Sequence, residues 1–147
     1  MLQYLDPVPF TIDNDSHFGL SETQGLLGCD GAHLVIEYRI ADTVIGALKT
    51  ASTALMLPLG ELHSIRYQSR YFGFVHSITL RTRNQRLLER LPESKMGMVT
   101  MKVRRQDREI AEAFCMGIRE AIARHTGRML EDELARLEGR EGGGRLE

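Results

Sequence analysis

Hydrophobic and polar residues alternate along the central part of the chain with the period of a β-strand. The clearest example is the segment 33–40, where Leu34, Ile36 and Tyr38 share one face and polar residues occupy the other. Such alternation is typical of a strand that is half buried in a sheet. The Asp30-Gly31 dipeptide just before it favours a hairpin turn, because glycine tolerates a positive φ. The pattern therefore predicts a β-hairpin at this point.

Further alternating segments follow, and Phe72 and Phe74 are expected on the buried side of the longest one, together with Ile78 and Leu80. Short strands at such regular spacing indicate an antiparallel sandwich or barrel. The connection 41–50 has no clear pattern. About seven strands are predicted in all: 25–29, 33–40, 52–57, 62–70, 72–83, 86–91 and 98–104.

The period changes from 2 to 3.6 after Arg104. Asp107 is a suitable N-cap for a helix that runs to about His125, and Gly127 follows the expected end. Each large residue of its apolar stripe contributes about 1.5–3 kcal/mol when buried, so this helix is expected to close the sheet. The stripe consists of Ile110, Phe114, Ile118, Ala121 and Ile122.

The length of 147 residues suits one domain, and 42% hydrophobic with 27% charged residues is a globular balance. The predicted division is an N-terminal arm over 1–24, the domain over 25–125, and a weak helix with a flexible tail over 126–147. No stretch has the apolar length of a membrane span, and the start has no signal-peptide pattern. The expected location is the cytoplasm. Cys29 and Cys115 lie far apart without a CxxC spacing. A single disulfide between them stays open, but without a secretion signal two reduced, mostly buried thiols are favoured.

Strands followed by one closing helix give the element order of the pleckstrin-homology-like (PH-like) superfold. The block 55–65, in which a strand reaches a corner at Pro58 and re-enters the sheet, resembles bacterial PH-like members. The run 101–111 resembles their last strand passing into the helix. The resemblance covers about residues 25–125 and implies a PH-like barrel or sandwich. It also implies a non-catalytic adaptor that binds phosphoinositides, peptides or proteins.

One feature departs from the phosphoinositide-binding members of that superfold. Those members carry several lysines and arginines around the first hairpin, whereas here Arg39 is its sole basic residue. Inositol-phosphate recognition of that type is therefore not expected.

Charge is distributed unevenly along the chain, although the net charge is −1. Residues 66–108 contain eleven basic and three acidic residues, so one basic surface is predicted on the strands of this segment. The alternative is that these cations bind no partner and only occupy the solvent-facing side of the strands. The candidate partner-binding face consists of Arg66, Arg70, Arg81, Arg83, Lys102 and Arg104.

A protein partner or an anionic membrane surface fits this basic face. Nucleic acid is disfavoured, because the face lacks interleaved aromatic residues for base stacking and the overall pI is near 6.5. Edge strands of the sheet could accept a partner strand or join copies of the chain, so a homo-oligomer stays open.

Candidate chemistry is sparse in the sequence. The five histidines form no spacing that suits a metal, and no serine lies in a GxSxG pattern. His76, on the apolar side of its strand, is interpreted as a core histidine. No catalytic residue, metal or cofactor is therefore predicted. Two alternatives remain: a small-molecule or lipid carrier with a hollow barrel, since only nine residues are aromatic, and, ranked lower, a small enzyme.

Overall fold

The computed structural model of the chain describes residues 5–13, 21–42 and 52–145. Within them, seven strands form one antiparallel sheet in the order β4-β3-β2-β1-β7-β6-β5. A long C-terminal helix, α1 (Arg108–Arg145), follows the last strand. The strands are β1 (Val8–Asp13), β2 (Ser21–Cys29), β3 (His33–Asp42), β4 (Thr53–Pro58), β5 (Leu62–Arg70), β6 (Val75–Thr82) and β7 (Met98–Val103).

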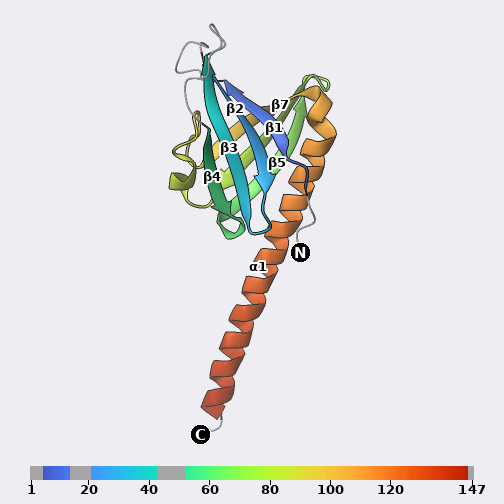
Figure 1. Cartoon of the computed structure of the whole chain (residues 1–147). Helices are drawn as coiled ribbons and strands as arrows, with labels where there is room; N and C mark the ends of the chain where they lie inside the picture. The colour runs from blue at the N-terminus through green and yellow to red at the C-terminus, as the bar shows by residue number, and fades with distance from the viewer. Residues whose placement is uncertain (1–4, 14–20, 43–51, 146–147) are drawn as a thin grey trace.

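The sheet folds over on itself. Figure 1 shows β1 to β4 crossing in front of β5 to β7. Buried apolar side chains form a single core cluster between the two halves of the folded sheet. This cluster includes Leu27, Ile36, Ile78, Leu80 and Met101. The edge strands β4 and β5 are not paired with each other in the described chain, so the sheet is not closed into a barrel. The expected class, mainly antiparallel β of the sandwich type with one C-terminal helix, is confirmed.

The first strand was not expected at the centre of the sheet. Instead of an arm, β1 lies in the middle of the sheet between β2 and β7, and β2 already begins at Ser21. β1 contains Pro9, and proline cannot donate a hydrogen bond to a β-ladder. The recorded pairing of β1 with β7 is limited to Thr11, so Pro9 lies where β1 pairs with β2 alone. The expectation of an arm is therefore wrong for the described residues 8–13 and 21–24, which belong to the sheet.

The segment 86–91 is also not a strand. It contains a short 3-10 helix, η3 (Gln85–Leu88), whose start is capped by the Asn84 side chain, which accepts a hydrogen bond from the Arg86 amide at 3.0 Å. Leu88 and Leu91 are fully buried. The pattern of apolar residues was therefore interpreted with the wrong period, because these leucines anchor a loop to the core.

Helix α1 has two different halves. Its first half packs on the sheet: Phe114, Ile118 and Ala121 of the expected stripe are buried, whereas Ile110 and Ile122 are only partly buried. Cys115 is buried as expected, and burial raises the pKa of its thiol to about 12. The second half runs on past Gly127 and projects away from the sheet (Figure 1). The predicted end near His125 and the separate weak helix are therefore wrong, and the helix is continuous.

Candidate interaction surfaces

The strand register aligns polar side chains across the outer face, the side of the sheet that points away from the apolar core. Thr11 of β1 lies opposite Lys102 of β7 on one side and Gln24 of β2 on the other. Gln24 in turn lies opposite Arg39 of β3. Successive residues of a strand alternate between faces, so opposed residues point the same way. One polar row therefore crosses six strands: Gln68, Ser77, Lys102, Thr11, Gln24 and Arg39.

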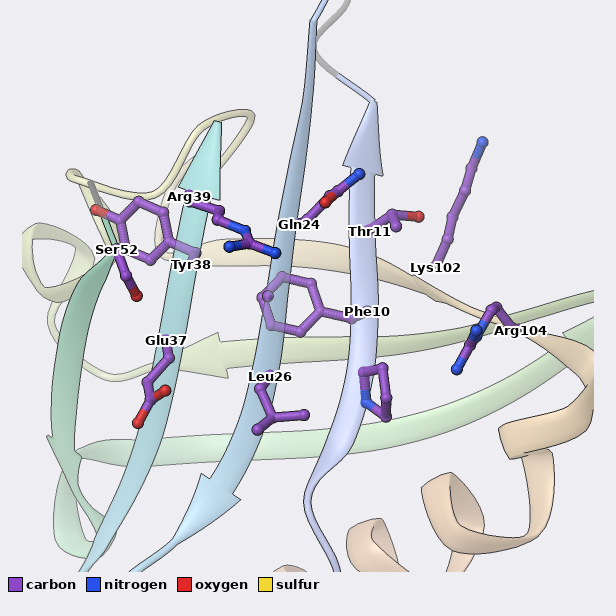
Figure 2. Close-up of a pocket in the computed structure, with 12 residues that line it drawn as sticks. Phe10, Thr11, Gln24, Leu26, Glu37, Tyr38, Arg39, Ser52, Lys102 and Arg104 are labelled. Atoms are coloured by element: carbon purple, nitrogen blue, oxygen red, sulfur yellow. The ribbon is translucent and has the colours of Figure 1, made fainter. Parts of the chain in front are cut away.

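A hollow of about 550 Å³ opens beside this row, and it is named here the outer-face hollow. Figure 2 shows its side chains projecting from three neighbouring strands, β1, β2 and β3, with Lys102 and Arg104 on the β7 side. Pro9 and Leu26 supply apolar surface within it. Its lining is Pro9, Phe10, Thr11, Gln24, Gly25, Leu26, Glu37, Tyr38, Arg39, Ser52, Lys102 and Arg104.

The backbone at Gly25 belongs to this lining, and it depends on the absence of a side chain. A Cβ added there would lie 2.4 Å from the Glu37 carbonyl oxygen and 2.4 Å from the Phe10 ring. Glycine in a strand interior is typical of a tight bend or a close backbone approach. Gly25 thus lets the Phe10 ring pack directly against β2, with β3 close on the other side.

The outer-face hollow is lined by three cations and one carboxylate. Arg39, Lys102 and Arg104 are all exposed, and Glu37 is the single acidic lining residue. Lys102 forms an ion pair with Asp13, and Arg104 pairs with Asp107 at 2.9 Å. The Lys102–Asp13 pair is exposed on both sides, and such pairs contribute only about 0–1 kcal/mol, whereas the Asp107 side chain is only 14% exposed. An incoming carboxylate can therefore replace Asp13 at Lys102 with little loss of stability.

The predicted basic face is assembled only in part. Arg66, Arg70 and Arg81 point outward from β5 and β6 on the same face as Lys102. Of the six predicted residues, however, only Lys102 and Arg104 line the outer-face hollow. Arg81 lies opposite Met98, at the other end of β7, and Arg83 follows the end of β6. The sequence pattern did not indicate Arg39, Thr11 and Gln24 as lining residues, because the pairing of β1 with β7 was not predicted.

The histidine interpreted as a core residue is buried. His76 is 5% exposed, and its Nδ1 lies 2.6 Å from the Tyr67 hydroxyl. Among the described residues, its Nε2 has no hydrogen-bond partner. Burial raises the pKa of Tyr67, with the nearby Glu112 of α1 adding to the shift. This pair lies at the junction of β5, β6 and α1.

A second hollow, of about 600 Å³, separates α1 from the β2–β3 turn and from the corner after β4. His33, Glu61 and His125 line it. The Asp30 carboxylate lies 3.3 Å from His33 Nδ1, but it also accepts hydrogen bonds from the backbone amides of Ala32 and His33. These backbone hydrogen bonds, that of His33 first, lower the pKa of Asp30. The Asp30 carboxylate therefore stabilises the β2–β3 turn.

Exposed leucines mark the projecting half of α1. Leu130, Leu134 and Leu137 are between 50% and 58% exposed, and their spacing of four and three residues places them on one side of the helix. Glu131, Glu133 and Glu138 occur among the residues beside this stripe. Arg128 and Arg136 lie in the same segment, so the stripe has charges of both signs beside it, and a second helix could cover it.

Comparison with known proteins assigns no family to the chain. No family model, curated protein or solved structure matches it. No helix within the described ranges is both long and apolar enough to cross a membrane. The same ranges contain no group of three or more histidine, cysteine, aspartate or glutamate residues placed to hold a metal ion.

Proposed function

We propose that the chain is a PH-like, non-enzymatic interaction module whose outer-face hollow binds an acidic segment of a partner protein. The element order supports the PH-like assignment: two antiparallel groups of strands, joined through β1 and β7, are followed by one helix that packs on the sheet. The proposal concerns a binding site, because function is argued from the site rather than from the fold.

The observation that carries this proposal is the set of cations around a concave, partly apolar surface. Arg39 approaches the hollow from β3, while Lys102 and Arg104 approach from the opposite side. An extended segment lying along the row would meet cations at both ends, with Thr11 and Gln24 between them and the apolar surface of Leu26 beside the row. Each exposed ion pair contributes only about 0–1 kcal/mol, so the affinity depends on several such contacts made together with apolar burial on Leu26.

The experiment compares two double charge reversals that change the net charge equally. Arg39→Glu with Lys102→Glu alters the outer-face hollow, and Arg81→Glu with Arg83→Glu alters cations away from it. The probe is a fluorescein-labelled oligoglutamate peptide, with binding measured by fluorescence anisotropy. We expect the first variant to bind about tenfold or more weakly than the unchanged protein, and the second to bind almost as well.

Equal losses in the two variants would contradict the proposal, because they would mean that the peptide senses only net charge. Circular dichroism melting of both variants serves as a control for folding. All four substituted positions are exposed, and surface substitutions usually change stability by no more than about 0.5 kcal/mol.

The alternative of a carrier with a hollow barrel has less support. Buried apolar side chains fill the space between the two halves of the sheet, and both described hollows open at the surface. Self-association through the unpaired edges of β4 and β5 remains a prediction, and light scattering above 16.6 kDa would indicate it.

A further inference from the structure

The turn between β5 and β6 carries aromatic side chains that project into solvent. Tyr71, Phe72 and Phe74 surround Gly73, and these four residues are named here the aromatic tip. Phe72 is fully exposed, while Tyr71 and Phe74 are 73% and 72% exposed. The sequence pattern had placed Phe72 and Phe74 on the buried side of a strand, and that expectation is wrong. β6 begins only at Val75, so neither phenylalanine contributes to the core.

The backbone of the aromatic tip is strained. Tyr71 and Phe72 have φ values of 54° and 57°, and Gly73 has 87°. The Phe74 amide donates to the Tyr71 carbonyl at 3.2 Å, so Phe72 and Gly73 are the central residues of a type I′ turn. Asn-Gly is the preferred pair there, and a bulky residue at positive φ is an outlier. Stability of the turn therefore does not explain Phe72, and strain of this kind concentrates at functional positions.

Arginines surround the base of the aromatic tip. Arg70 ends β5 and lies opposite Val75. The pairing of His76 with Val103 places the end of β7, and Arg104 and Arg105 after it, beside the start of β6. Figure 1 shows the β5–β6 turn next to the beginning of α1, where Arg108 acts electrostatically on Tyr67 of β5.

Acidic residues are also present at this end of the fold. Asp107 pairs with Arg104, and Glu109 and Glu112 lie in the first turns of α1. Arg70 and Arg105 have no carboxylate partner within the described residues, and both are exposed. The cations closest to the tip therefore remain available to an anionic surface.

We propose that the aromatic tip inserts into the interfacial region of an anionic membrane, with Arg70 and Arg105 contacting lipid headgroups. Phenylalanine and tyrosine suit this region, because their rings enter the headgroup boundary while a tyrosine hydroxyl stays hydrated. Each arginine near an anionic surface adds attraction that salt screens. Exposed aromatic rings with cations at their base are the combination that binds an anionic lipid interface.

This membrane contact is separate from the binding proposed for the outer-face hollow. The hollow is lined mainly from β1, β2 and β3, whereas the tip joins β5 to β6. Both contacts together would recruit an acidic partner to a membrane. Substitutions at the tip leave the hollow unchanged, so failure of one proposal is distinguishable from failure of the other.

The test is co-sedimentation of the full chain with vesicles. The vesicles contain phosphatidylcholine with about a third phosphatidylserine, and pure phosphatidylcholine vesicles are compared. The tip variant combines Phe72→Asn with Phe74→Ser, and the control is Met129→Asn, an exposed apolar residue on α1. We expect the unchanged protein and the control to sediment with anionic vesicles, and the tip variant to bind about tenfold or more weakly.

Thermal melting separates binding from folding. Asparagine adopts positive φ more readily than phenylalanine does, so the tip variant should melt at the same temperature or higher. Loss of vesicle binding without loss of stability would support the proposal. The proposal is overturned if the unchanged protein stays in the supernatant at low salt. It is equally overturned if the tip variant sediments as well as the unchanged protein, because adsorption would then rest on cations elsewhere.

Discussion

Replacing Phe114 with alanine should lower the free energy of unfolding by about 3–5 kcal/mol, which is the usual cost of deleting a buried phenylalanine. Phe114 is 1% exposed and is among the largest fully buried side chains of the protein. It lies on the face of α1 that packs against the sheet, together with Ile118. Its loss would leave a cavity between helix and sheet, and chemical denaturation monitored by circular dichroism measures the effect.

The matched control for this substitution is Met116→Ala, two residues further along the same helix. Met116 is 59% exposed, so its replacement should change stability by no more than about 0.5 kcal/mol. If Phe114→Ala were as stable as this control, α1 would not be packed on the sheet as described.

Gly25→Ala is expected to destabilise the protein by about 1–3 kcal/mol, because the new methyl group would overlap existing atoms. One of them, the Glu37 carbonyl oxygen at 2.4 Å, belongs to the backbone of β3 and cannot turn away as a side-chain end could. The strands must shift to make room. Because Gly25 also lines the outer-face hollow, the same substitution should weaken binding of the oligoglutamate peptide.

Gly28→Ala provides the comparison within the same strand. No atom lies within 4 Å of a Cβ added at Gly28, so alanine should be tolerated or should stabilise the fold by about 0.4–1 kcal/mol. Equal unfolding midpoints for Gly25→Ala and Gly28→Ala would show that the close approach at Gly25 does not exist.

Periodicity predicted the parts of the fold in which local pattern and burial agree. The strand 62–70 was expected with the bounds that the structure gives to β5, and the strand 52–57 differs from β4 by one residue at each end. The stripe of α1 was found because its apolar side chains repeat every three to four residues and all contact one sheet. Such signals depend on neighbouring residues alone.

Other elements depend on contacts between distant segments, which a local pattern does not contain. β1 is short and carries Pro9, and only its position between β2 and β7 identifies it as central. Leu88 and Leu91 belong to a segment that was expected to be a strand, although both are buried from a loop. A glycine at a position such as Gly127 usually marks the end of a helix, yet α1 continues through it. At the aromatic tip, strand alternation failed because three consecutive residues have positive φ.

The candidate site was likewise predictable only where the pattern along the chain is local. Lys102 and Arg104 could be assigned to a basic strand face from charge alone. Their neighbours Thr11 and Arg39 come from strands more than sixty residues earlier in the sequence, and the β1–β7 pairing alone brings them together. A single sequence contains no local pattern that indicates this pairing.

The most direct test is nuclear magnetic resonance mapping of where the oligoglutamate peptide binds on the isotope-labelled full chain. We predict that amide shifts will move with peptide concentration at Thr11, Gln24, Arg39 and Lys102, while those near Arg81 stay in place. Saturable shifts confined to another surface, or no shifts at concentrations that produce anisotropy changes, would contradict an acidic-segment site in the outer-face hollow.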